Sequence, residues 1–177
     1  MVREIVMYGS RVLRRRADPV AAVDADLRSL IEDLFGTLAG ADGVGLAAPQ
    51  IGASRRVIVV DVSSQEPTRP PIALVNPVLA IGQGTATAEE GCLSIPEQYG
   101  EVSRYANVEI CALDQDGQPY RFGAEGFYAR VLQHEIDHLD GKLFIDYLPP
   151  LKRQLMRGAL KRIKRQGELW DRLHLPD

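Results

Sequence analysis

Residues 133–141 (QHEIDHLDG) carry two of the chain's three histidines, four positions apart, with a glutamate directly after the first. Positions four apart in an α-helix lie about 40° apart around the axis and one turn along it. His134 and His138 would therefore project from one face and could hold a divalent ion together. Glu135 would stand beside that ion without binding it, where a carboxylate can act as a general base. The alternative is a pair of histidines on the solvated face of an ordinary helix; the intervening glutamate favours the metal site.

A catalytic site of this kind needs a third protein ligand and one open position. Downstream, Asp146, Glu168 and His174 could supply that ligand, as in zincin peptidases, but none stands in a distinctive context. Upstream, Cys92 lies in EEGCLSIP, whose glutamates, serine and proline make poor surroundings for a buried apolar thiol. As a thiolate, Cys92 would complete a Cys-His-His site. Nucleophilic Cys-His catalysis is a weaker option, because the histidine spacing already accounts for both rings.

The composition is that of an ordinary globular protein, 45% hydrophobic and 25% charged over 177 residues. No apolar run reaches the length of about 18 residues that a membrane span requires. The N-terminus also lacks the apolar segment of a signal peptide, so we expect a cytoplasmic protein. In that reducing compartment Cys92 and Cys111 would stay thiols. We interpret Cys111, in VEICALD, as core filler.

Three helices are predicted from apolar periodicity. The first spans residues 24–39, and the second, over residues 125–139, carries the histidine motif. The third begins after Pro149-Pro150. We expect its apolar stripe to pack on the rest of the chain, through Leu151, Leu155, Met156, Leu160 and Ile163.

Strands are predicted where short apolar stretches are bounded by Gly, Pro or Asp, over residues 56–62, 72–81, 105–113, 118–122 and 144–148. The Asp-Gly pair between the third and fourth of these is a strong hairpin signal. We therefore predict an α+β fold, with mixed or antiparallel β-sheets around a central metal-binding helix. An N-terminal and a C-terminal helix complete a single domain over residues 1–177.

Three stretches, in this order, closely resemble the signature motifs of the peptide deformylase family: GVGLAAPQ (43–50), EGCLS (90–94) and QHEIDHLDG (133–141). The resemblance extends from YGSRVLRRRADPV near the start to GKLFIDYLPPLKR after the histidine motif. The EGCLSIPEQ form and the long C-terminal helix resemble the bacterial, type 1 branch. This resemblance implies a hydrolase that removes the formyl group from the N-terminal formyl-methionine of newly made proteins and releases formate.

The resemblance also implies a metal centre. Cys92, His134 and His138 would bind one divalent ion, Fe(II) in the native state, with Zn(II), Ni(II) or Co(II) possible in the purified protein. Thiolate and imidazole suit such borderline ions.

A mechanism follows from the same resemblance. Metal-bound water would attack the formyl carbon, with Glu135 first taking its proton and then delivering it to the departing amine. The side-chain amide of Gln50 and the backbone N–H of Leu93 would stabilise the oxyanion.

Substrate contacts are expected from matching positions, at Gly43, Val44, Gly45, Ala88, Glu90, Phe127 and Val131. The two glycines would at least permit a tight turn, and a bare backbone at Gly45 would let a peptide add as an extra strand. Val44, Ala88, Phe127 and Val131 would surround the methionine side chain, with Arg130 at the rim. We also hypothesise that Glu90 pairs with Arg104 and braces the cysteine loop.

The C-terminal segment is basic. Residues 151–177 carry a local balance of +5, against −8 for the remaining 150 residues. Such a face is either simply solvated or, as the resemblance implies, docks onto ribosomal RNA near the exit of the nascent chain. We expect formyl-methionyl nascent peptides as the substrate partner and a monomer as the working form.

Two other classes remain in competition. A zincin-type peptidase would keep its metal when Cys92 becomes serine, whereas a deformylase would lose or weaken its metal binding. A structural metal module would need a fourth ligand, and no further Cys or His is well placed for one.

Overall fold

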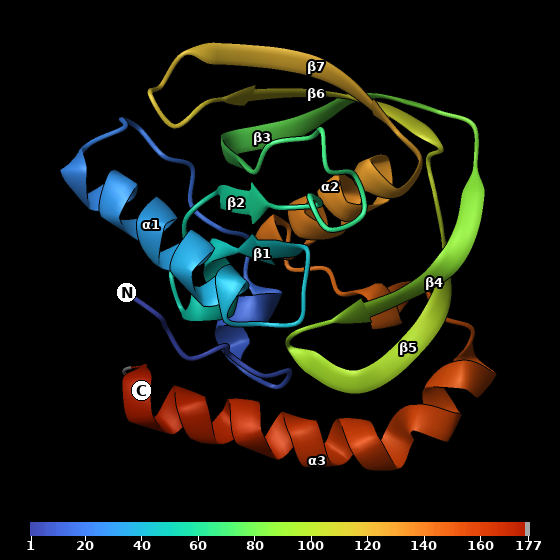
Figure 1. Cartoon of the computed structure of the whole chain (residues 1–177). Helices are drawn as coiled ribbons and strands as arrows, with labels where there is room; N and C mark the ends of the chain where they lie inside the picture. Colours follow the sequence, from blue (N-terminus) through green and yellow to red (C-terminus); the bar gives the residue numbers. More distant parts are fainter. Residues whose placement is uncertain (176–177) are drawn as a thin grey trace.

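The computed structural model describes residues 1–175, which fold into two antiparallel sheets and three α-helices (Figure 1). One sheet has five strands in the order β1-β2-β3-β6-β7, and the other is the β4–β5 hairpin. The elements in chain order are η1 (Arg11–Arg14), α1 (Ala25–Ala39), β1 (Gly45–Ala47), η2 (Ala48–Ile51), β2 (Val57–Val60), β3 (Ile72–Gln83), β4 (Ala86–Cys92), β5 (Ile95–Arg104), β6 (Asn107–Leu113), β7 (Pro119–Glu125), α2 (Gly126–Leu139), η3 (Phe144–Tyr147) and α3 (Pro150–His174).

The five-stranded sheet is covered on both faces near β2. Alternate side chains of a strand point to opposite faces. Accordingly Ile58 and Val60 pack with α2 residues such as Leu132, while Val57 and Val59 belong to the core that includes α1. All four β2 residues are buried, which explains why the segment is continuously apolar.

Helix α2 lies between the sheet and the hairpin, and the two sheets curve around it in Figure 1. The predicted α+β fold with a central histidine-bearing helix is confirmed. The predicted first helix is also confirmed, with the Asp24 carboxylate accepting a 2.8 Å hydrogen bond from Leu27 N as its N-cap. None of the helices within residues 1–175 is both long enough and apolar enough to cross a membrane.

Residues 144–148 form no strand, and that prediction is wrong. The segment Phe144–Tyr147 is the 3₁₀ turn η3. Asp146 explains the turn, because its carboxylate accepts a hydrogen bond from Leu143 N while its own N–H donates to Leu143 O. An Asp side chain that bonds nearby backbone in this way competes with strand pairing.

The predicted stripe of α3 is partly wrong, because Leu151 and Leu155 are exposed. The buried positions are Met156, Ile163, Gly167 and Asp171, which recur at the helical period and continue further along the chain than expected. Leu155 lies about 100° away from Met156 around the helix and therefore falls outside this face. Cys111, expected as core filler, is half-buried on β6.

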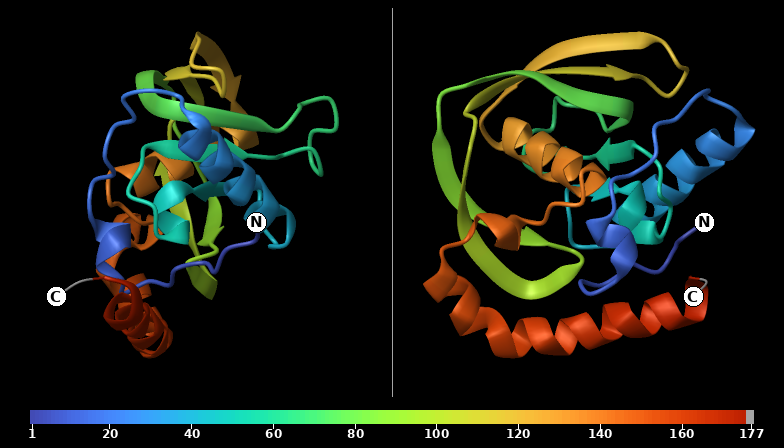
Figure 2. Two further views of the ribbon diagram at one scale, coloured as in Figure 1. Left: turned by 90° about the vertical axis from the view of Figure 1, so that its left-hand side faces the viewer. Right: turned by 180° about the vertical axis from the view of Figure 1, so that it is seen from behind.

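Helix α3 runs beneath the hairpin and the N-terminal segment, as Figure 2 shows. The Asp171 carboxylate accepts hydrogen bonds from Ser10 Oγ and Arg11 N. A Cβ added at Gly167 would lie 2.3 Å from Met7 O and 2.4 Å from Ser10 N. The close approach of α3 to the N-terminal segment therefore depends on glycine at this position.

We predict that Gly167→Ala destabilises the protein by up to about 2 kcal/mol, because overpacking against backbone costs about 1–3 kcal/mol and the gain in helix propensity is only about 1 kcal/mol. Urea unfolding measures the change. The matched control is Gly158→Ala on the exposed face, where the nearest atom to an added Cβ is 4.0 Å away. That control should be neutral or stabilising, and a stabilising Gly167→Ala would contradict the packing described here.

Candidate active site

Helix α2 buries the histidine motif. It begins where β7 ends, and Gly126 takes a left-handed φ of 58° at that junction. His138 is 1% exposed and Glu135 is 4% exposed, so the motif does not lie on a solvated helix face. This burial raises the pKa of Glu135 to about 7.

Cys92 reaches the two histidines from the tip of the hairpin. A register shift between Glu90 and Cys92 precedes the tight connection to β5. The thiol Sγ lies 3.3 Å from His138 Nε2, and the ligand atoms of Cys92, His134 and His138 all lie within 4.8 Å of one another. The upstream cysteine is therefore the residue that joins the histidine pair.

The downstream ligand candidates lie elsewhere. Asp146 pairs with Arg14 and caps η3. Glu168 pairs with Lys164 on the surface of α3, and the ring of His174 stacks on Trp170. None of the three downstream candidates belongs to the Cys-His-His group.

The donor set fits a divalent ion. His134 Nδ1 lies 2.9 Å from Glu90 Oε2, and a carboxylate only accepts, so Nδ1 carries the proton and Nε2 keeps its lone pair. Within the described residues, Glu135 Oε2 and His138 Nδ1 are buried without a hydrogen-bond partner. One thiolate and two imidazoles are ligands that Fe(II), Zn(II), Ni(II) and Co(II) accept, and three ligands leave a position open.

Glu90 is the hub of a buried charged network. Arg104 donates to Oε1 from Nε at 2.6 Å and to Oε2 from Nη2 at 3.0 Å, and Arg130 Nη1 donates to Oε1 at 2.7 Å. Burial by itself opposes ionisation, but hydrogen bonds from His134 and Arg104 outweigh it and lower the pKa of Glu90 to about 2. The expected pair between Glu90 and Arg104 is thus formed, whereas Arg130, expected only at the rim of the methionine pocket, is a second arginine partner of Glu90.

Gln50 is held by the short turn η2. Pro49 stands in its first turn and Gly52 ends it with a left-handed φ of 82°. Gln50 Oε1 accepts from Ala47 N at 2.9 Å, so the amide nitrogen Nε2 faces Ser94 Oγ at 3.2 Å and Cys92 Sγ at 3.6 Å. Of these contacts Ser94 was not anticipated, although it lies within the EGCLS motif.

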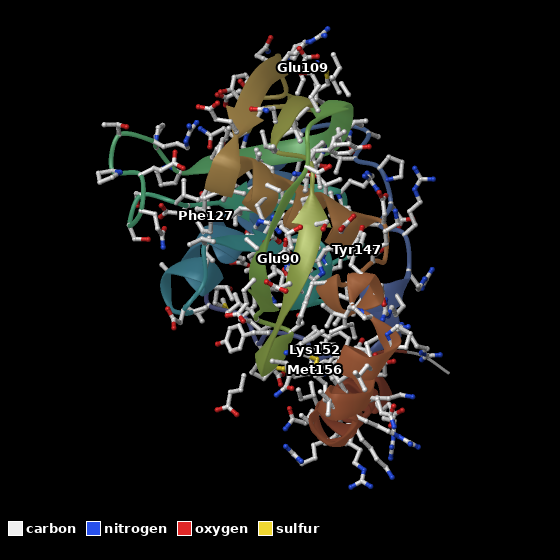
Figure 3. The ribbon with its side chains drawn as sticks, turned by 90° about the vertical axis from the view of Figure 1, so that its right-hand side faces the viewer. Glu90, Glu109, Phe127, Tyr147, Lys152 and Met156 are labelled. Carbon is white, nitrogen blue, oxygen red and sulfur yellow. The ribbon has the colours of Figure 1, made fainter. Side chains whose placement is uncertain are left out.

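An open cleft of about 680 Å³ leads to these groups. Its lining includes Leu93 and six of the expected substrate contacts, namely Gly43, Val44, Gly45, Glu90, Phe127 and Val131. Ala88 is exposed on β4 and lies outside this lining. Arg130 lines the cleft but is buried, and its guanidinium turns toward the hairpin. In Figure 3 Glu90 lies at the hairpin, with Phe127 to one side and Tyr147 to the other.

Gly45 has a role that its sequence context does not reveal. A Cβ at this position would lie 2.4 Å from Glu135 Oε1 and 2.8 Å from Glu135 Cδ. The side chain of Glu135 therefore packs directly against the bare backbone of β1. Glycine here sets where the carboxyl can sit, in addition to any contact with substrate.

A buried glutamate beside a Cys-His-His ligand group, at the floor of an open cleft, defines the class of metal-dependent hydrolases. The family described as polypeptide deformylase matches residues 2–154. The chain belongs to this family of enzymes, which use a divalent metal ion, and the resemblance inferred from the three motifs is confirmed.

The relatives cover nearly the whole chain. It is 46% identical over 168 residues to the peptide deformylase of Alkalilimnicola ehrlichii, covering 95% of this chain and 94% of that protein. It is 44% identical over 165 residues to the peptide deformylase of Endomicrobium trichonymphae, covering 93% and 97%.

Solved structures give the same result. A crystal structure of a peptide deformylase from Legionella pneumophila matches with a TM-score of 0.86 and 45% identity, over 93% of this chain and 96% of that one. A peptide deformylase from Synechococcus elongatus, solved in complex with actinonin, matches with a TM-score of 0.78 and 40% identity, over 89% and 84%.

We predict that Gly45→Ala lowers hydrolysis of a formyl-methionyl peptide at least about 100-fold, because a side chain there displaces the Glu135 carboxyl. Metal content, measured by elemental analysis, should stay at the parent value since no ligand moves. Gly123→Ala is the control, because its added Cβ has no neighbour closer than 4.0 Å. Parent-like activity in Gly45→Ala would contradict the placement of Glu135.

Proposed function

We propose that this enzyme removes the formyl group from the N-terminal formyl-methionine of newly synthesised proteins and releases formate. The observation that carries the proposal is the buried Glu135, which lines the cleft beside the Cys92, His134 and His138 group and whose Oε2 has no hydrogen-bond partner among residues 1–175. The hydrolysis of a formyl amide needs a proton acceptor next to the water and donors next to the carbonyl oxygen. Both kinds of group line this cleft.

Cys92, His134 and His138 would hold the divalent ion, and we propose Fe(II) in the cell, with Zn(II), Ni(II) or Co(II) able to replace it in purified protein. When bound, such an ion supplies Lewis acidity, which lowers the pKa of water and polarises a carbonyl. Glu135 accepts the proton that the attacking water loses. Because the departing amine then needs a proton, the same carboxyl delivers it.

The oxyanion is stabilised by two donors on separate loops. Gln50 is anchored through its Oε1 to Ala47 N, so its Nε2–H groups face the reaction centre. Leu93 directly follows Cys92 and lines the cleft, which supports its backbone N–H as the second donor. Donors fixed beforehand cost little reorganisation when charge develops.

The peptide is bound as an added strand. β1 (Gly45–Ala47) is the first strand in the order of the five-stranded sheet, so one of its edges is free of a β partner in the described fold. A substrate backbone can pair with that edge. The methionine side chain is placed among Val44, Phe127 and Val131, the apolar side chains of the expected set that line the cleft; Ala88 is not included.

We further propose that residues 1–177 act as one catalytic domain, as a monomer, in the cytoplasm, where formylated chains are made. The family match ends at residue 154, so most of α3 extends beyond it. All seven basic residues in 151–165 are exposed, at Lys152, Arg153, Arg157, Lys161, Arg162, Lys164 and Arg165. This face supports docking onto ribosomal RNA through phosphate contacts.

We predict that Glu135→Ala lowers formate release from a formyl-Met peptide at least about 1,000-fold, since general acid–base catalysis is lost at both steps. The metal content should remain at the parent value. Formate is measured with the parent and with Glu32→Ala, an exposed glutamate on α1, as matched control. Unchanged formate release in Glu135→Ala overturns the mechanism. A zincin-type peptidase would instead cleave unformylated internal peptide bonds.

For the basic face, we predict that ribosome binding weakens steeply between low and moderate salt. Arg157→Glu with Arg162→Glu should lower the slope of log affinity against log salt by about two, because roughly one counterion is released per phosphate contact. Co-sedimentation at several salt concentrations measures this slope. Arg28→Glu on α1 serves as control. Binding that is independent of salt would eliminate the docking proposal.

A further inference from the structure

The face of α2 that meets the hairpin carries four polar residues at helical spacing, Arg130, Gln133, His134 and Asp137. Gln133 binds the backbone of Tyr105, directly after β5. Its side chain accepts a hydrogen bond from Tyr105 N and donates one to Tyr105 O, both at 3.0 Å. His134 bonds Glu90, and Asp137 accepts from Arg104 Nη1 at 2.8 Å. The hairpin forms its own two-stranded sheet. Side chains of α2 therefore help to set the distance between the β4–β5 hairpin and this helix.

Arg130 makes the widest of these connections. Its Nη1 donates to Glu90 Oε1 at 2.7 Å and to Val102 O at 2.8 Å, and its Nη2 donates to Ala86 O at 2.6 Å. Ala86 belongs to β4 and Val102 to β5, so one rigid guanidinium spans both strands. Arg130 is only 8% exposed. The planar fork of arginine holds several acceptors in fixed directions.

Charge compensation alone does not require this second arginine. Arg104 already holds the Glu90 carboxylate with two hydrogen bonds, in the bidentate geometry that arginine and carboxylates favour. What Arg130 adds is its pair of bonds to backbone carbonyls of the hairpin. These two bonds fix the positions of β4 and β5 relative to α2. Pairing with the Glu90 side chain alone would leave those positions adjustable.

Arg130 joins α2 to the β4–β5 hairpin, and the metal ligands are divided between these two elements. Cys92 ends β4, two residues after Glu90, while His134 and His138 lie on α2, one and two turns after Arg130. The Sγ of Cys92 lies 3.3 Å from His138 Nε2. A small shift of the hairpin relative to α2 would therefore change the shape of the ligand triangle directly.

We propose that Arg130 is a positioning residue for the metal centre: it fixes the separation between the hairpin that carries Cys92 and the helix that carries the two histidines. It acts through the backbone of β4 and β5 as well as through Glu90. The inference rests on the proposed function only in that Cys92, His134 and His138 bind a divalent ion.

The test compares Arg130→Met, which keeps the length of the stem but loses all three hydrogen bonds, with Arg130→Lys, which keeps the charge. Each protein is loaded with Co(II) under anaerobic conditions. Cobalt affinity is measured by chelator competition, and the ligand-field and thiolate charge-transfer bands are recorded. Arg121→Met is the control, because Arg121 is an exposed arginine on β7 with an ion pair to Glu109.

We expect Arg130→Met to weaken cobalt binding about 10-fold or more, the effect typical of residues that orient metal ligands, and to shift the absorption bands. Arg130→Lys should restore part of both, and the control should match the parent. A purely structural role would lower the melting temperature without moving the spectrum. Parent-like affinity and spectrum in Arg130→Met overturn the inference.

If Arg130→Met does not fold, Arg130→Lys decides alone, and a spectrum identical to the parent's overturns the inference. A failure of the proposed function would be distinguished from a failure of this inference by measuring formate release from the parent protein. A parent protein that binds Co(II) through Cys92 but releases no formate would refute the deformylase assignment and leave the role of Arg130 intact.

Discussion

The Glu90 carboxylate, buried between two guanidinium groups and an imidazole, is the interaction on which the rest of the site depends. It is 7% exposed and accepts hydrogen bonds from Arg104, Arg130 and His134. A buried carboxylate is costly unless it is paired and hydrogen-bonded. Here its partners come from β5 and from α2, so satisfying one charge also joins the hairpin to the helix. The hydrogen bond between His134 Nδ1 and Glu90 also fixes the tautomer of His134.

The groups of the active site lie on α2, on β1 with the turn that follows it, and on the β4–β5 hairpin. Contacts elsewhere in the fold hold these three segments in place. Two cores, one on each face of the five-stranded sheet, fix α2 and β1 and thereby set Glu135 against Gly45. The N-terminal segment supports the other loops, because Val6 N donates to Gln50 O and Tyr8 N donates to Ser94 O. Helix α3 packs on this segment through Gly167 and Asp171. The basic helix is thus connected to the loops beside the cleft.

Much of this arrangement could be predicted from the sequence because local rules determine it. The spacing of His134 and His138, the cap at Asp24 and the continuous apolar run of β2 each follow from one element alone. The polar face of α2 could have been noticed as a recurrence at positions 130, 133, 134 and 137. Its partners could not, because they lie on the β4–β5 hairpin, and the packing of that hairpin against α2 is nonlocal in the sequence. For the same reason Arg130 was expected at a pocket rim, whereas its guanidinium bonds the hairpin.

The central claim is that the charge of Glu90 orders the metal site, and Glu90→Gln tests it most directly because the amide keeps the size of the carboxylate and removes its charge. The measurement is the dissociation constant for Co(II), by chelator competition, of variant and parent. This account predicts binding at least about 10-fold weaker in the folded variant. Equal affinity for cobalt in the two proteins would contradict it.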